Sequence, residues 1–334
     1  MSNTTEYGEN AIHIQHSSVQ TAVGGSHNTV IIQQAAAPRT PTFPLSNLVG
    51  GNAHFVGREA ALQALTAATE PTAPATPLVI AGLGGVGKSQ LLRQFAHQHR
   101  QRFDIVWWAR VDETWGQDML ALGRALCLPV DGLPLEAALQ MVRTWLNGCP
   151  QRWLLLCDNA DVTTAAQLLP LLPSNPQGRI LITSRNGDWG NVARPFPLGA
   201  FAAAESDAFW RQRLGDKYEE GEEWEELASL LGHLPLALEH SAAYMLAKGK
   251  RSADYLRLYQ KQRRALWDKT PPPPDYPATV ATTWRVSFDA ARETAGAGEL
   301  LALCAFLAPV DLPLELLEDA NVEQCPRIAP YHCR

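Results

Sequence analysis

The chain has 334 residues, 46% of them hydrophobic and 19% charged, which is typical of a folded protein with room for two or three domains. A formal net charge of −6 with scattered Lys and Arg argues against nucleic acid as a ligand. The polar amino terminus and the lack of an apolar stretch of about 18 residues predict no signal peptide, no stable membrane insertion and a cytoplasmic location.

Residues 1–34 are rich in Asn, Gln, Ser, Thr and His and have too little apolar surface for a core of their own. The part from 11 to 34 nevertheless lacks proline, carries almost no charge and contains β-forming residues around 12–14 and 30–32. Such a segment either is disordered or pairs with copies of itself in amyloid-like stacks. A proline-containing linker is expected over residues 35–51.

Residues 52–202 are expected to form an α/β domain. Short, continuous apolar runs alternate there with helical patterns at 90–102 and 135–145. Continuous apolarity indicates strands that are buried on both faces, so we predict a parallel sheet. The four predicted strands are 78–81, 105–108, 153–157 and 180–183.

Residues 203–270 have helical periodicity throughout and predict an α-helical domain. Its helices are expected at 203–214, 222–231, 236–248 and 253–264. Four prolines at 271–274 then interrupt the chain, and a helical pattern from 279 to about 307 predicts the start of a third domain, assigned to 275–334.

The strongest motif follows the first predicted strand. The run Gly82-Leu83-Gly84-Gly85-Val86-Gly87-Lys88-Ser89 fits the phosphate-loop pattern GxxxxGK[ST] between a strand and a helix. Glycines let successive N–H groups face phosphate oxygens, and the helix dipole favours negative charge at that end. We therefore predict ATP or ADP with Mg²⁺, rather than a glycine-rich turn without a ligand. The expected nucleotide contacts here are Gly82, Gly84, Gly85, Val86, Gly87, Lys88, Ser89 and Gln90, with Ser89 also binding the metal.

Two further strand ends carry candidate catalytic residues. Asp158 ends one buried run and is the expected second Mg²⁺ ligand, although a helix cap would also explain it. Asn159 occupies the position where many hydrolytic ATPases have a second carboxylate, and since an amide cannot accept a proton we expect slow hydrolysis. Arg185 follows Thr183 and Ser184 and is suited to sensing the γ phosphate, unless it is an ordinary surface arginine.

Together these features resemble the NB-ARC branch of the STAND signal-transducing ATPases, the nucleotide switches of NLR-like immune receptors. The similarity extends from about Phe55 to Pro313. Asp158 and Arg185 match the family's magnesium aspartate and sensor arginine. Other matching runs are the opening motif Phe55-Val56-Gly57-Arg58-Glu59, which lies against adenine in the family, the second-strand motif at 103–108, and Gly232-His233-Leu234-Pro235-Leu236-Ala237, whose Pro235 packs near adenine.

The resemblance implies a P-loop NTPase domain in which the sensor strand lies between the phosphate-loop strand and the Asp158 strand. A helical domain and a winged helix would follow, the latter present only in part. Asn159 departs from the family's usual second aspartate. Gly25-Ser26-His27-Asn28-Thr29-Val30 also resembles half of the RIP homotypic interaction motif, an amyloid signalling motif, but Val19-Gln20 lies farther from it than that pattern allows.

The sequence thus predicts an intracellular ATP/ADP switch, in defence or regulated cell death, that forms a homo-oligomer on activation. Its amino-terminal segments would then stack and recruit an effector protein with a matching amyloid motif. Two alternatives stay open. A turnover ATPase of the remodelling type would need an arginine finger and a second acidic residue, and a STAND transcriptional regulator would need a DNA-binding domain.

Overall fold

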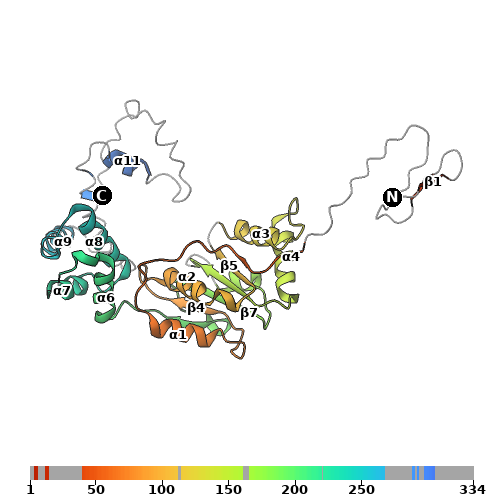
Figure 1. Ribbon diagram of the computed structural model, residues 1–334, viewed down its shortest axis with the longest axis horizontal. Coiled ribbons are helices and arrows are strands. Elements are labelled where there is room, and N and C mark those ends of the chain that lie inside the picture. Colours follow the sequence, from red (N-terminus) through yellow and green to blue (C-terminus); the bar gives the residue numbers. More distant parts are fainter. Residues whose placement is uncertain are drawn as a thin grey trace.

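The computed structural model describes residues 4–6, 12–14, 40–111, 114–160, 165–219, 221–267, 288–289, 292 and 297–304. An α/β unit is followed in the chain by a group of helices that lies beside it (Figure 1). Within the described ranges, no helix combines the length and the apolarity needed to cross a bilayer.

The α/β unit contains a six-stranded parallel sheet in the order β3-β5-β6-β7-β4-β8. All four predicted strands are confirmed, and β7 lies between β6 and β4, as the resemblance implied. The strands are β3 (Leu45–Ser46), β4 (Leu78–Ala81), β5 (Ile105–Arg110), β6 (Trp153–Asp158), β7 (Gly178–Ser184) and β8 (Arg194–Pro197).

The two edge strands, β3 and β8, differ from the sequence prediction. β3 lies inside the expected linker 35–51, and the side chain of Asn47 extends its pairing by bonding both the N–H (2.7 Å) and the C=O (2.8 Å) of Trp108. β8 contains Pro195 and Pro197, which an edge strand tolerates because one of its sides needs no ladder partner. Neither strand has the long apolar run that identifies a central strand.

Helices cover both faces of the sheet. Helices α1 (Glu59–Ala68) and α2 (Lys88–His99) contribute to one core, while α3 (Trp115–Ala125) and α4 (Leu135–Gly148) contribute to the other. Along β6 the side chains alternate between these cores, which explains why the whole run is apolar. Shorter elements are α5 (Ala165–Leu168) and the 3₁₀ turns η1 (Arg100–Arg102), η2 (Leu169–Leu171), η3 (Gly190–Val192) and η4 (Gly215–Lys217).

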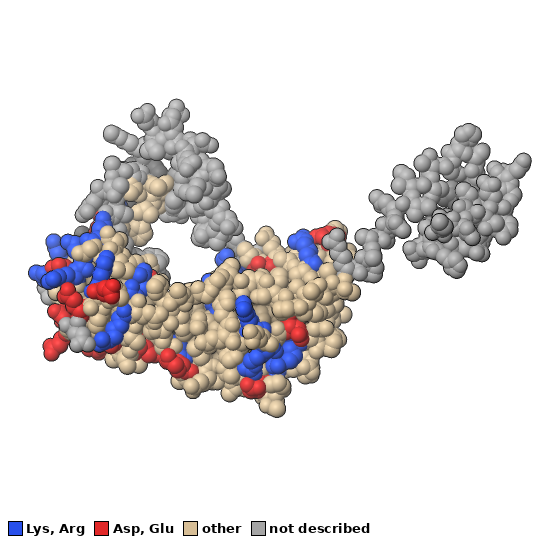
Figure 2. Space-filling model, in the orientation of Figure 1, with Lys and Arg blue, Asp and Glu red and all other residues tan. Residues whose placement is uncertain are grey.

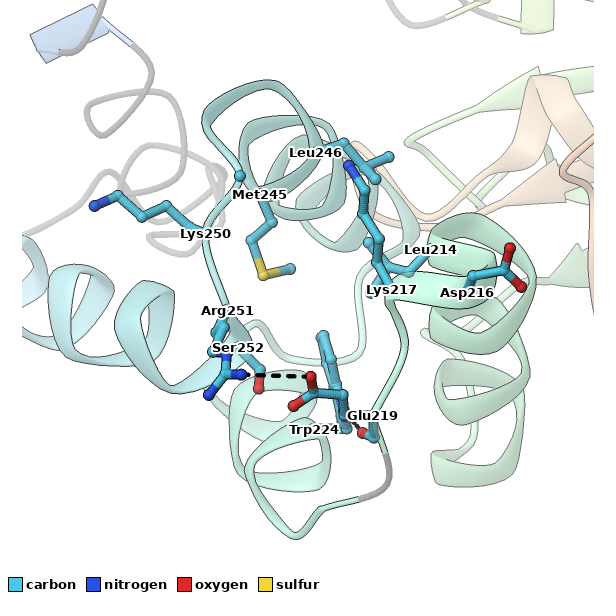
Figure 3. A pocket seen from close by; sticks show the side chains of 11 residues that line it. Leu214, Asp216, Lys217, Glu219, Trp224, Met245, Leu246, Lys250, Arg251 and Ser252 are labelled. Carbon is cyan, nitrogen blue, oxygen red and sulfur yellow. Dashed lines mark hydrogen bonds and ion pairs between the residues drawn. The ribbon is translucent and has the colours of Figure 1, made fainter.

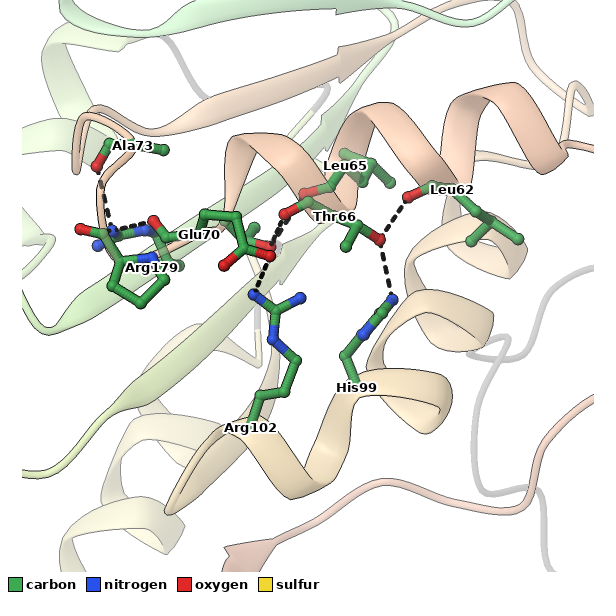
Figure 4. Close-up of polar contacts among 10 residues, drawn as sticks. Leu62, Leu65, Thr66, Glu70, Ala73, His99, Arg102 and Arg179 are labelled. Atoms are coloured by element: carbon green, nitrogen blue, oxygen red, sulfur yellow. Dashed lines mark hydrogen bonds and ion pairs between the residues drawn. The ribbon is translucent and has the colours of Figure 1, made fainter.

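A buried cation anchors the loop that leads from α1 into β4. Arg179, at the start of β7, is only 4% exposed, and its guanidinium donates hydrogen bonds to five backbone carbonyls. These acceptors belong to Glu70, Pro71, Ala73, Pro176 and Gly178. The bond to Ala73 is drawn in Figure 4. Arg179 therefore holds the loop that leads into β4, which is the strand that precedes the phosphate loop.

The same view shows how α1 is tied to the carboxyl end of α2. The Glu70 carboxylate pairs with Arg102 at 2.8 Å, and the Thr66 hydroxyl lies 2.9 Å from Nε2 of His99 (Figure 4). Thr66 Oγ1 already donates to the carbonyl of Leu62 at 2.8 Å, so it accepts from His99, whose Nε2 carries the proton. Burial, with a smaller contribution from Arg102, lowers the pKa of His99.

The helical unit contains all four predicted helices, namely α6 (Ala203–Leu214), α7 (Glu223–Leu230), α8 (Pro235–Lys248) and α9 (Ser252–Trp267). Trp210, Trp224, Tyr255 and Tyr259 are buried at its centre. In the expected third domain, the described helical residues are 288–289 and α11 (Ala297–Cys304). The winged helix predicted over 275–334 otherwise lies outside the described residues.

In the amino-terminal segment, β1 (Thr4–Glu6) pairs antiparallel with β2 (Ile12–Ile14). The half-motif from Gly25 to Val30 lies outside the described residues, so its predicted stacking stays a prediction.

Candidate nucleotide-binding site

The phosphate loop connects β4 to α2 and has a backbone that only glycine accommodates. Gly85 and Gly87 have φ values of 81° and 94°, in the left-handed region. A side chain at Gly82 would place its Cβ 2.3 Å from the carbonyl oxygen of Leu198. The predicted loop therefore has the expected position and glycine dependence.

Lys88, the first residue of α2, turns its side chain onto this loop. Its Nζ donates to the carbonyls of Gly82 at 2.8 Å and Leu83 at 3.1 Å. A positive charge is thus placed among backbone groups that can face a phosphate. Gln90, two residues further on, is exposed, and its side-chain Oε1 accepts a hydrogen bond from Nδ2 of Asn52 at 3.5 Å.

The two predicted magnesium ligands are in contact. Oδ1 of Asp158 accepts a hydrogen bond from the Ser89 hydroxyl at 2.6 Å and another from the Thr183 hydroxyl at 2.6 Å. Mg²⁺ prefers hard oxygen ligands of this kind, and the donor set fits a metal held between α2 and β6. When bound, Mg²⁺ would neutralise charge on the phosphates, while Ser89 and Asp158 would hold it.

Thr183, which the sequence placed at the end of a buried strand just before the sensor candidate Arg185, orders this cluster. Its side chain is 1% exposed, and its Oγ1 also accepts from the backbone N–H of Asn159 at 2.8 Å. The hydroxyl therefore fixes both Asp158 and the residue after it. The Asn159 backbone is left-handed, with φ 62°, and its side chain is exposed.

Arg185 follows β7 directly and is exposed. The preceding residue, Ser184, is in register with Ala81, and its carbonyl accepts from the N–H of Gly82 at 3.3 Å. The backbone therefore places Arg185 next to the start of the phosphate loop. Its sensing of a γ phosphate stays a prediction.

The opening motif 55–59 lies between the two units. Phe55 packs against the core that contains α2, whereas Val56 packs against the core of the helical unit. Gly57 and Arg58 have consecutive left-handed backbones, with φ values of 69° and 66°. Burial lowers the pKa of Arg58, while the nearby Glu205 carboxylate opposes that shift.

The run 232–237 brings the helical unit onto the phosphate loop. Pro235 is the first residue of α8, and the N–H of Leu236 donates to the carbonyl of Gly85 at 3.1 Å. A Cβ at Gly87 would lie 3.8 Å from Pro235, which is ordinary contact distance. The predicted site residue Pro235 is thus beside the phosphate loop, although no sequence signal indicated the Leu236 bond.

Two hollows lie elsewhere on the molecule. One, of about 300 Å³, is in the helical unit, with Trp224 and Met245 among its lining residues and Lys217, Lys250 and Arg251 around it (Figure 3). The other, of about 710 Å³, runs along β3 and the end of α2. Neither of these two is lined by a phosphate-loop residue, so neither enlarges the site.

Charged side chains of both signs gather over the helical unit in the view of Figure 2. Several of them form ion pairs across or along its helices, including Arg213 with Glu239 at 2.9 Å and Arg211 with Asp207 at 2.8 Å. These pairs bring opposite charges together on the surface of the helical unit.

Comparison with known proteins finds regulatory and NLR-like relatives. Over 144 residues the chain is 36% identical to the regulatory protein AfsR of Streptomyces griseus, covering 39% of this chain and 14% of AfsR. Over 324 residues it is 25% identical to a nucleotide-binding leucine-rich repeat (NLR)-like protein of Hyaloscypha variabilis, covering 81% of this chain and 31% of that protein. The chain thus spans less than a third of the length of these relatives.

A similar solved structure is the Walker-type ATPase PABY2304 of Pyrococcus abyssi, with a TM-score of 0.43 and 17% identity over 64% of this chain and 74% of that one. The family model of the AAA ATPase domain matches residues 54–251, which include the phosphate loop, Asp158, Arg185 and Pro235. A domain of this kind binds ATP, typically with Mg²⁺, so the nucleotide prediction is supported at the level of the family. Because the match covers more than half of the sequence, the chain belongs to the AAA ATPase domain family.

Proposed function

We propose that this chain is an NLR-like regulatory switch in which ATP and ADP act as conformational ligands. The observation that carries the proposal is the bond from the N–H of Leu236 to the carbonyl of Gly85. It joins the helical unit to the middle of the phosphate loop. A nucleotide that occupies the loop must therefore act on the docking of the helices.

The physical basis is differential affinity. A ligand shifts an equilibrium between two arrangements only by as much as its binding free energy differs between them. Phosphates would compete with the carbonyls of Gly82 and Leu83 for the ammonium group of Lys88. They would also draw the loop N–H groups inward, which changes the position of the Gly85 carbonyl relative to the N–H of Leu236. ADP and ATP, which differ by the γ phosphate that Arg185 is expected to sense, would then favour different arrangements.

Asn159 favours a switch over a remodelling ATPase. Its amide cannot act as a general base next to Asp158, so hydrolysis would be slow and each nucleotide state long-lived. The similarity to an NLR-like protein supports a signalling role, and the similarity to the regulatory protein AfsR supports a regulatory one. A transcriptional regulator is the second candidate.

The proposal also includes the signalling step that follows the switch. In it, ATP-bound chains self-associate in the cytoplasm and bring copies of residues 1–34 together, which recruits an effector with a matching amyloid motif. High local concentration would drive pairing of short β segments without any new contact in the switch itself.

The nucleotide part of the proposal is tested with Lys88→Ala, because Lys88 supplies charge to phosphates and no core packing. We expect loss of ADP and ATP binding in calorimetry with an unchanged circular dichroism spectrum. Lys217→Ala, a lysine of the helical unit, is the control. ADP at a hundredfold excess over its Kd should stabilise the wild type by about 2.7 kcal/mol. Wild-type affinity in Lys88→Ala would refute nucleotide binding at this loop.

The switch part is tested by limited proteolysis and small-angle scattering of the ADP form and of the form bound to a non-hydrolysable ATP analogue. We expect the two forms to differ in cleavage around residues 199–202, the connection into α6, and in radius of gyration. Identical results from two fully occupied forms would contradict a conformational switch while leaving nucleotide binding intact.

A further inference from the structure

We infer that Glu205, on the first turn of α6, is a positioning residue for nucleotide binding that acts through Arg58. We call this pair the Arg58–Glu205 latch. The inference deepens the proposed function, because it names the contact that couples the helical unit to the shape of the phosphate loop.

The Glu205 carboxylate has both oxygens occupied by backbone donors. Oε1 accepts from the N–H of Arg58 at 2.6 Å, and Oε2 accepts from the N–H of Ala202 at 2.8 Å. The second bond caps the amino terminus of α6, where a carboxylate is also favoured by the helix dipole. The first bond reaches across 147 positions of sequence to the opening motif.

The space around Gly57 is shaped to the same carboxylate. A Cβ at Gly57 would lie 2.8 Å from Oε1 of Glu205, and its φ of 69° is strained for any other residue. Arg58 itself has a left-handed backbone, which costs free energy for a non-glycine residue. The charge-assisted bond from the Arg58 N–H to the Glu205 carboxylate offsets that cost and so holds residue 58 in this conformation.

The Arg58 side chain then contacts two separate segments. Its Nη2 donates to the carbonyl of Val86 at 3.1 Å and to that of Gly199 at 2.8 Å. Its guanidinium also lies 4.7 Å from the centre of the Phe201 ring, which packs against the helical core. Val86 lies between Gly85 and Gly87, the two loop residues with positive φ. The guanidinium therefore fixes the middle of the phosphate loop.

The consequence is a chain of contacts from α6 to the phosphate loop: Glu205 holds the Arg58 backbone, and the Arg58 side chain holds Val86. Without Glu205, residue 58 can leave its left-handed conformation and withdraw its side chain from Val86. The loop N–H groups would then be less well oriented for phosphates, and ADP would bind more weakly.

The test measures ADP affinity by calorimetry in Glu205→Ala, Arg58→Ala and the double variant. Each single variant should weaken ADP binding about tenfold, the size of one lost charge-assisted hydrogen bond. Because the two residues act in series, the double variant should bind about as weakly as either single one. Glu239→Ala, which breaks an ion pair between α6 and α8, should stay within about twofold of wild type.

A conservative variant separates positioning from folding. In Glu205→Gln the amide oxygen can still accept from Arg58, whereas the NH₂ group cannot accept from Ala202, so ADP affinity should lie between wild type and Glu205→Ala. Hydrogen exchange at residues 85–87 should be faster in Glu205→Gln than in wild type, and unchanged in Glu239→Gln.

The latch is refuted if folded Glu205→Ala binds ADP like the wild type, or if the double variant loses about a hundredfold, the product of two independent tenfold effects. It is equally refuted if a folded Arg58→Ala variant, which lacks the donor to Val86, leaves exchange at residues 85–87 unchanged, a result that holds even where Glu205→Ala does not fold. Lys88→Ala, measured in parallel, distinguishes the two proposals: if it loses ADP while Glu205→Ala does not, only the latch fails.

Discussion

Removing the Thr183 hydroxyl tests the reasoning about the site most directly. Thr183→Val keeps the shape of the side chain and the β-branched character that suits β7, but it deletes one donor and one acceptor. The donor serves the Asp158 carboxylate at 2.6 Å, and the acceptor serves the N–H of Asn159 at 2.8 Å.

The expected loss in the free energy of unfolding follows from these two hydrogen bonds. A hydrogen bond to a charged group contributes about 1.5–3 kcal/mol, and a neutral one contributes about 1 kcal/mol. Because Thr183 is buried, no water readily replaces its hydroxyl, so we expect the free energy of unfolding to fall by about 2.5–4 kcal/mol. Thr183→Ser is the matched control, since it keeps the hydroxyl and loses only a methyl group, at a cost of about 1 kcal/mol.

The assay is urea unfolding of the nucleotide-free protein, followed by circular dichroism, with wild type and both variants compared at one pH. A second measurement is ATP affinity with and without Mg²⁺, because Asp158 without its Thr183 partner should hold the metal in a less defined position. If Thr183→Val unfolds at the same urea concentration as Thr183→Ser, the hydroxyl does not order this cluster and the reasoning is wrong.

Three other predictions follow from single residues. Arg179→Met should lower the free energy of unfolding by about 2–4 kcal/mol, since it removes the donor of five hydrogen bonds from a part-buried group of carbonyls, and a melting temperature equal to wild type would contradict this. Asn159→Asp should raise the rate of phosphate release at least about tenfold by supplying a general base, whereas Asn159→Ala should not. The lowered pKa of His99 means that the unfolded chain binds a proton more readily than the folded one, so stability should fall as pH drops below about 6.5. His99→Gln should reduce that fall in urea titrations at pH 5 and 7.5, and an unchanged difference between the two pH values would exclude His99 as its source.

The sequence by itself determined the local parts of this protein. The four central strands were predictable because strands covered on both faces need continuous apolar runs. The helices α6 to α9 were predictable because each buries one face at helical spacing. The phosphate loop was predictable because its glycines, Lys88 and Ser89 are consecutive, so the chemistry and the backbone geometry are encoded in eight neighbouring residues.

Weak local signals explain what sequence reasoning missed in the fold. β3 has only two residues, and its pairing is extended by an Asn47 side chain that imitates a backbone. β8 contains two prolines, which normally argue against a strand. Each of these two strands is stabilised by pairing with its neighbouring strand in the sheet, and that neighbour lies far away in the chain.

Only the tertiary structure decided which groups complete the site. Thr183 meets Asp158 from 25 positions away, and Glu205 meets Arg58 from 147 positions away. A hydroxyl or a carboxylate forms these bonds only where the fold brings a donor within about 3 Å, and local periodicity carries no information on such distances. The sequence therefore determined where phosphates can bind. The packing of the helical unit onto the phosphate loop decided which residues position that loop.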